Sequence, residues 1–292
     1  MPLCPTARII MTSLKRIAAL TMVRGDDFYL RKWVEYYGRA LGRENLYILF
    51  DGTDQSVPTF CEGTNTFLYE RKAGSVVEGD KRRIDILSAK AAELFSKGYE
   101  IVIGTDADEY IAVDPRTGKS LREYLSQAKI SPCLSPLGID LGQVEGVEGD
   151  ISLERPFLQQ RSRGVLSTRY TKAAIISRPL RWGRGFHRVK GHNFHIAPDL
   201  YLFHCGYFDL SRLRERFADP DRRADGWQKH LEKRSRTIRT TTSCRSPKDF
   251  DKWTRRARRI QTLIRPPYAW NKPAMFNAKI VVAIPERFKS TL

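Results

Sequence analysis

The 292-residue sequence is 41% hydrophobic and 29% charged, a mixture typical of a folded globular protein that excludes collagen, a coiled coil and a fully disordered chain. The net charge is +18, and most of it lies near the C-terminus, because residues 211–292 hold 22 basic and 8 acidic side chains. Such a charge favours an anionic partner: nucleic acid, an acidic glycan or a membrane surface.

The first 110 residues alternate apolar runs with helical patterns. Three apolar runs predict strands buried on both faces: 17–23, 46–50 and 99–103. Apolar residues spaced three and four apart predict helices over 30–41 and 84–95, the second capped by Asp80. A weaker strand is expected over 66–69. This alternation predicts an α/β fold, with a mostly parallel sheet flanked by helices.

The pattern is looser after residue 111. A short helix is expected over 121–128, and the Gly- and Pro-rich stretch 131–150 predicts a loop with short strands. Two later strands are expected over 171–176 and 200–203. The basic region beyond residue 211 predicts helices interrupted by prolines.

Each of the three predicted strands ends in a charged residue: Arg24, Asp51 and Asp106. In an open parallel sheet, ligands bind beyond the carboxyl ends of the strands, where the connecting loops and the helix N-termini meet. We therefore expect these side chains to face one crevice.

Asp106 and Asp108, in the segment GTDADEYI, follow the third strand directly. Two carboxylates separated by one residue suit a hard divalent cation such as Mg²⁺ or Mn²⁺. A cation at this place can stabilise the charge on a departing diphosphate. The sequence contains no G-x-G-x-x-G after the first strand, no P-loop and no G-x-S-x-G motif. The remaining interpretation is a nucleotide-diphosphate site built around a metal.

In their order, these segments resemble the glycosyltransferase family 2-like proteins of bacteria, which have the GT-A fold. The resemblance covers about residues 16–217 and rests on YLRKWVEYY, TDADEYI, TKAAIISRPLRWGRGFH (171–187) and DLYLFHCGYFD (199–209). It implies transfer of a sugar from a nucleotide-sugar donor to a hydroxyl acceptor. It also implies that Asp51 contacts the base or ribose of the donor, and that Asp106 and Asp108 hold the metal and the diphosphate. Arg24 stands where that group more often has Lys-Asn-Glu.

A late histidine completes the metal shell in many enzymes of this kind, and the resemblance offers His187 and His204. We prefer His204, because it follows the apolar run LYLF and so stands at a strand end. Lys81, Arg82 and Arg83 open the second helix, and we expect Arg82 to reach the donor diphosphate with help from the positive helix end.

An inverting enzyme needs a carboxylate that accepts the proton of the acceptor hydroxyl. We expect Asp140 to do this, because its flanking glycines let the backbone approach a ligand closely. Other carboxylates remain open as alternatives: Glu145, Glu148, Asp150 and Asp209. Retaining chemistry also remains open.

The sequence therefore predicts a cytoplasmic, metal-dependent glycosyltransferase. Its positive charge leaves open a peripheral contact with the anionic surface of the inner membrane. Its acceptor would be a surface polysaccharide or a lipid-linked glycan. We expect an N-terminal extension over 1–15, the GT-A-like catalytic domain over 16–210 and a basic helical extension over 211–292. Two alternatives remain: a non-catalytic nucleic-acid-binding protein using the basic region, and a metal-dependent nucleotidyltransferase that releases pyrophosphate.

Overall fold

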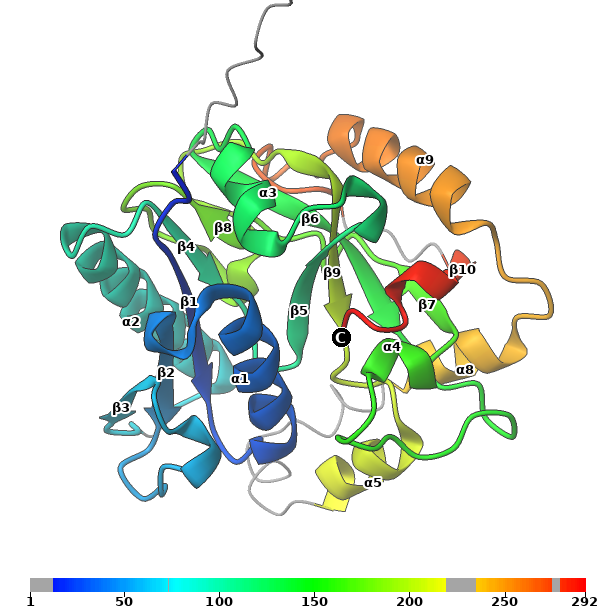
Figure 1. Cartoon of the computed structure of the whole chain (residues 1–292), viewed down its shortest axis with the longest axis horizontal. Coiled ribbons are helices and arrows are strands. Elements are labelled where there is room, and N and C mark those ends of the chain that lie inside the picture. Colours follow the sequence, from blue (N-terminus) through cyan, green and yellow to red (C-terminus); the bar gives the residue numbers. More distant parts are fainter. Residues whose placement is uncertain (1–12, 73, 219–234, 275–278) are drawn as a thin grey trace, which may run out of the picture.

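A computed structural model of the chain describes residues 13–72, 74–218, 235–274 and 279–292. In this part of the chain, ten strands form one twisted sheet with helices on both sides (Figure 1). The main strand order is β10-β7-β6-β8-β4-β1-β2-β3, and β9 joins β6 to β5. The α/β fold class predicted from the sequence, a sheet flanked by helices, is confirmed. Most of the expected N-terminal extension lies outside the described residues.

The N-terminal half of the sheet is parallel, as predicted. It consists of β3 (Asn65–Tyr69), β2 (Leu46–Asp51), β1 (Ile17–Val23) and β4 (Ile101–Gly104). The other half is mixed. Its antiparallel run consists of β8 (Ile175–Ile176), β6 (Cys133–Leu141), β7 (Arg163–Leu166) and β10 (Val281–Ala283). By contrast, β9 (Ile196–His204) runs parallel to β6 and antiparallel to β5 (Glu109–Val113).

The buried strand β1 separates two apolar cores. Ile17, Ala19 and Val23 pack in the core that contains α1 (Asp27–Leu41). Ala18, Leu20 and Met22, which alternate with them, pack in the core that contains α2 (Val76–Ser96). Because successive side chains of a strand point to opposite faces, α1 and α2 cover opposite sides of the sheet.

Helix α2 begins earlier than predicted, and the expected cap at Asp80 is wrong. Ser75 occupies the N-cap, where its Oγ accepts a hydrogen bond from the N–H of Glu78 (3.3 Å). The Glu78 carboxylate accepts one in return from the N–H of Ser75 (2.9 Å), which completes a capping box. The basic residues at 81–83 therefore lie beyond the first turn, away from the positive helix end.

The stretch predicted as a loop over 131–150 contains β6, a strand of nine buried residues. Pro136 lies where the pairing of β6 with β9 shifts register, a place where a strand tolerates proline. Gly138 lies so close to the Tyr170 backbone that a Cβ there would be 2.3 Å from its carbonyl carbon. Proline and glycine are uncommon inside strands, so the sequence pattern does not indicate β6.

The basic C-terminal region is helical, as predicted, and packs on the same sheet. Its described helices are α5 (Leu210–Ala218), α8 (Arg236–Ser243) and α9 (Phe250–Leu263). The chain then returns to the sheet edge as β10, beside β7. Phe250 and Phe288 are buried against Tyr201 of β9, at ring separations of 5.1 and 5.6 Å. Two further helices are α3 (Leu121–Gln127), which contacts α1 and β5, and α4 (Phe157–Gln160), whose Phe157 stacks on Phe28 of α1.

No helix in the described segments combines the length and the apolar character that crossing a membrane requires.

Candidate functional site

The turn between β4 and β5 carries the D-x-D residues. The N–H of Glu109 donates to the carbonyl of Asp106 (3.1 Å) and closes this turn. Trp33 of α1 donates from Nε1 to Thr105 Oγ1 (2.9 Å), which fastens the end of β4 to the helix. In this tight turn, the carboxylates of Asp106 and Asp108 contact different neighbours.

Three adjacent strands bring further polar side chains to Asp108. Glu109 of β5 is the register partner of His204 of β9, and His204 is the register partner of Asp140 of β6. Asp108, Glu109 and His204 offer ligand atoms that all lie within 4.8 Å of one another. His204 Nε2 lies 3.7 Å from Asp108 Oδ2. Among the described residues, this is the group with the spacing to hold a cation.

The imidazole of His204 is fixed from two sides. Its Nδ1 lies 2.7 Å from Asp140 Oδ1, and the ring of Tyr170 stacks on it at a centroid distance of 3.7 Å. Thr237 of α8 donates from Oγ1 to Asp140 Oδ2 (2.6 Å). An aspartate bound to Nδ1 places the proton there and leaves the lone pair of Nε2 facing Asp108. This is the tautomer that a metal ligand requires.

The space beside these atoms depends on Gly206. A Cβ at this position would lie 2.2 Å from Asp108 Oδ2 and 2.7 Å from His204 Nε2. Such contacts are too short for any other residue to stand there without displacing the two ligand atoms. Two carboxylates and one imidazole are a donor set that suits a divalent cation such as Mn²⁺. The residues present therefore fit the expected metal.

Asp106 is not a member of this group, although the sequence predicts it as a metal ligand with Asp108. Its carboxylate is bound by Arg83 Nη2 (2.5 Å) and Lys172 Nζ (3.0 Å), and Lys172 also forms an ion pair with Glu109. Burial raises the pKa of Asp106, but the charges of Lys172 and Arg83 outweigh it and hold this pKa well below its usual value. In the group whose ligand atoms lie within 4.8 Å of one another, Glu109 is present and Asp106 is not.

Arg83, rather than the expected Arg82, is the residue of α2 that reaches Asp106. Arg82 donates to the backbone carbonyl of Glu70. Arg83 lies four residues before the buried Leu87 and so shares its face of the helix. Because successive residues point in different directions around a helix, Arg83 faces Asp106 and Arg82 does not.

Arg24 and Asp51 meet at the carboxyl ends of β1 and β2, through the backbone of Asp51. Arg24 Nη1 donates to the backbone carbonyl of Asp51 (3.0 Å). The same guanidinium forms a two-pronged ion pair with Asp54, at 2.9 and 2.8 Å. The two residues thus lie together at the sheet edge at which β4 also ends.

Arg216 of α5 lies next to Asp108, in the carboxylate cluster formed by Asp108, Glu109 and His204. It donates to the carbonyl of Gly206 (3.0 Å), pairs with Asp26 (3.1 Å) and lies 3.7 Å from Asp108. Burial alone lowers the pKa of Arg216, but the charges of Asp26 and Asp108 outweigh this and raise it. A helix of the basic region thus supplies a permanent positive charge at the site.

His187, the alternative ligand, lies outside the group and is held neutral. Burial, together with the charge of Lys172, lowers its pKa from 6.5 to about 3. Because the folded-state pKa lies below the unfolded value, this residue stabilises the fold fully above pH 6.5 and less as the pH falls towards 3. Between pH 7 and pH 5 we expect the parent to lose about 2 kcal/mol more unfolding free energy than the variant His187→Gln.

Urea unfolding at both pH values measures this difference. Replacement of the exposed His195 by Gln is the matched control. Equal losses for the parent and His187→Gln would contradict the prediction.

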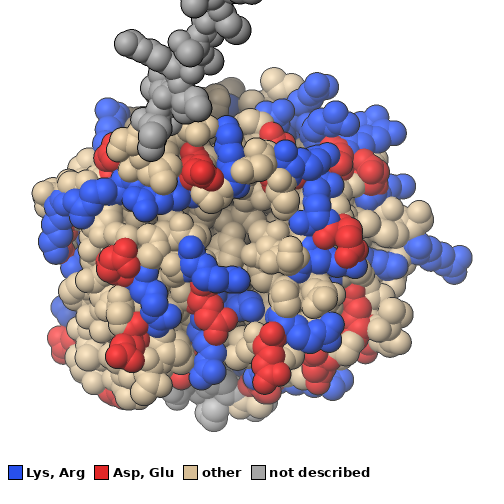
Figure 2. Space-filling model, viewed as in Figure 1, with Lys and Arg blue, Asp and Glu red and all other residues tan. Residues whose placement is uncertain are grey.

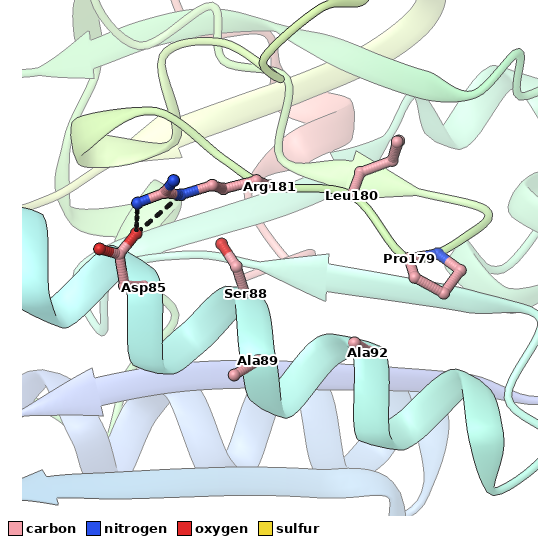
Figure 3. Close-up of a pocket in the computed structure, with 7 residues that line it drawn as sticks. All are labelled: Asp85, Ser88, Ala89, Ala92, Pro179, Leu180 and Arg181. Carbon is pink, nitrogen blue, oxygen red and sulfur yellow. Dashed lines mark hydrogen bonds and ion pairs between the residues drawn. The ribbon is translucent and has the colours of Figure 1, made fainter.

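A separate open hollow lies between α2 and the segment 179–181 (Figure 3). The hollow is lined by Asp85, Ser88, Ala89, Ala92, Pro179, Leu180 and Arg181 (Figure 3). Arg181 binds Asp85 there, at 2.5 and 2.9 Å. None of the residues lining it belongs to the carboxylate cluster.

No protein-family model matches the sequence, and no curated protein matches it. Solved structures do show partial likeness, and three of them illustrate its extent. A mannosyltransferase from Pyrobaculum calidifontis, in complex with GDP-mannose and Mn²⁺, is 11% identical with a TM-score of 0.39, covering 76% of this chain and 65% of its own. A glycosyltransferase involved in glycosylation of the major capsid of PBCV-1 is 20% identical, with a TM-score of 0.24. The match covers 42% of this chain and 50% of that protein. A mannose-1-phosphate geranyltransferase from Thermus thermophilus is 13% identical, with a TM-score of 0.28. The match covers 75% of this chain and 64% of that protein.

The chain thus spans less than two thirds of the length of each of these proteins. With TM-scores below 0.5, these likenesses carry no conclusion about its function.

Proposed function

We propose that the chain is a metal-dependent glycosyltransferase, similar to family 2, that moves a sugar from a nucleotide-sugar donor to a hydroxyl acceptor. The acceptor class that fits the basic surface is an anionic polysaccharide or a lipid-linked glycan. The observation that carries the proposal is the convergence of Asp108, Glu109 and His204 within 4.8 Å, directly after β4. This is the edge of a parallel sheet where ligands bind.

Asp108, Glu109 and His204 would hold Mn²⁺ or Mg²⁺. When bound, the ion supplies positive charge to the departing diphosphate. Arg24 and Asp51 would meet the nucleoside at the ends of β1 and β2.

Asp106 would act through the two cations that it binds. Its ion pairs hold Arg83 and Lys172 beside the cluster, where both can offer charge to a phosphate group. Asp106 thus remains a donor-binding residue in this proposal, while its place as a metal ligand passes to Glu109.

Asp140 orients His204 in this arrangement and is not free to act as a base. Both of its oxygens accept hydrogen bonds, one from His204 and one from Thr237. We expect Asp140→Asn to weaken Mn²⁺ binding by roughly 10- to 100-fold. Thr237→Val should weaken it less, because the Thr237 hydroxyl binds Asp140 and not His204 itself.

Calorimetric titration with Mn²⁺ and separate measurement of kcat and KM check this role. An unchanged Mn²⁺ affinity together with a large loss of kcat in Asp140→Asn would contradict it and restore Asp140 as the base.

The proposed activity is tested with a panel of UDP-, GDP- and CMP-sugars in the presence of Mn²⁺, by following donor hydrolysis and transfer. Release of a nucleoside phosphate, with dependence on the metal, supports the proposal. In a parallel assay with nucleoside triphosphates and a sugar 1-phosphate, release of pyrophosphate would assign a nucleotidyltransferase instead. Tight, salt-dependent DNA binding without turnover of any donor would assign the nucleic-acid-binding alternative.

A further inference from the structure

The exposed side of α9 is basic. Phe250, Thr254 and Gln261 turn towards the protein and are buried, whereas Arg255, Arg256 and Arg259 are exposed. No carboxylate occurs in the sequence of residues 252–272. In Figure 2, Lys and Arg side chains gather at the upper right, where Figure 1 places α9. This helix therefore carries a positive charge that no carboxylate in 252–272 offsets.

The end of the same helix and the loop after it are apolar and exposed. The exposed fractions are 46% for Ile260, 78% for Leu263, 45% for Ile264, 71% for Tyr268 and 73% for Trp270. These are five of the ten large hydrophobic residues that are exposed in the described part of the chain. Such a concentration within eleven residues marks an interaction surface.

The loop that carries the two aromatic residues is anchored to the protein. Asn271 Nδ2 donates to the carbonyl of Val189 (3.0 Å). Arg265 Nη1 donates to Asn193 Oδ1 (2.5 Å) and, within the loop, to the carbonyl of Trp270 (2.6 Å). Ala269, between the aromatic residues, is 5% exposed. The backbone is thus fixed while the rings of Tyr268 and Trp270 face solvent.

We propose that α9 and the loop to Lys272 dock the protein on an anionic lipid bilayer. Arginines of the helix would lie against the acidic headgroups, which attract polybasic segments. Trp and Tyr favour the level of the headgroups, and Leu and Ile favour the acyl boundary below them. Nucleic acid would account for the arginines, but not for the exposed Leu263 and Ile264. The bilayer is therefore the partner that uses both halves of this surface.

The test is cosedimentation of the full chain with vesicles of phosphatidylcholine, with and without phosphatidylglycerol. We expect binding only to the vesicles with phosphatidylglycerol, and weaker binding as salt is raised. The double variant Leu263→Ser, Trp270→Ser should bind at least roughly tenfold more weakly, and so should Arg255→Gln, Arg259→Gln.

Matched controls make the same chemical changes elsewhere. Val77→Ser, Val147→Ser replaces two exposed apolar residues, and Arg31→Gln, Arg39→Gln removes two exposed charges. Both controls should bind like the parent. Melting temperatures establish that each variant is folded.

Three outcomes would overturn the proposal: no vesicle binding by the parent, equal binding by the serine variant, or an equal loss in the controls. If duplex DNA is bound tightly while vesicles are not, the surface belongs to a nucleic-acid partner. Sugar transfer to a soluble acceptor is measured separately, so failure of the docking surface and failure of the proposed activity are distinguishable.

Discussion

Asp108→Asn is expected to abolish nearly all metal-dependent sugar transfer, with a loss of roughly 1,000-fold, or about 4 kcal/mol of transition-state stabilisation. The amide keeps the size of the carboxylate but removes the charge that faces His204 and Arg216 at 3.7 Å. The Mn²⁺ affinity, measured by calorimetry, should fall together with kcat. Because Asp108 is partly exposed and its neighbours keep other partners, the melting temperature should change little.

Glu154→Gln removes the charge of an exposed carboxylate outside the cluster and serves as the matched control. If Asp108→Asn retained the activity and the Mn²⁺ affinity of this control, Asp108 would not be a metal ligand.

The largest effect on stability is expected at Arg161, whose side chain is fully buried with that of Asp209. The guanidinium binds Asp209 Oδ2 (2.7 Å) and the carbonyls of Phe208 (2.7 Å) and Gly149 (3.0 Å). Arg161→Met would leave a buried carboxylate without a cation, a change that costs about 3–5 kcal/mol. The melting temperature should fall by roughly 6 °C or more.

Two further variants serve as a matched control and as a rescue in this experiment. Arg155→Met removes an exposed arginine nearby in the sequence and should melt like the parent. Addition of Asp209→Asn to Arg161→Met should recover part of the loss, because the buried charge is then gone. A single variant Arg161→Met that melts within about 2 °C of the parent would contradict the expectation.

Strands buried on both faces were predictable because they read as continuous apolar runs. Strands β1, β2 and β4 follow this rule, and every residue of β1 and β4 is buried. Strand β5 breaks it, because it opens with Glu109, whose burial depends on Lys172, 63 positions later in the chain. No local pattern announces such a partner.

The capping of α2 and the facing arginine did have local signals. Ser75 and Glu78 stand in the S-x-x-E spacing of a capping box, which is a stronger start signal than Asp80. The spacing of Ile84, Leu87 and Ala91 already fixes the buried face of the helix, and this phase selects Arg83 over Arg82.

The composition of the candidate site was predictable only in part. The placement of Asp108 and His204 follows from strand ends, which the sequence marks with polar residues after apolar runs. The turn that separates Asp106 from Asp108, and the hydrogen bond of Thr237 to Asp140, 97 residues apart, are set by tertiary contacts. Asp209, one of the open alternatives for the base, is committed to Arg161, which no spacing in the sequence indicates.

The central claim is that Asp108, Glu109 and His204 bind a divalent cation together. Crystals grown with Mn²⁺ and a nucleoside diphosphate, measured at a wavelength where manganese scatters anomalously, test it directly. We expect one anomalous peak at about 2.0–2.4 Å from an oxygen of Asp108, an oxygen of Glu109 and Nε2 of His204, with the diphosphate beside it. A diphosphate bound with no peak at these three residues, or a manganese ion bound elsewhere, would contradict it.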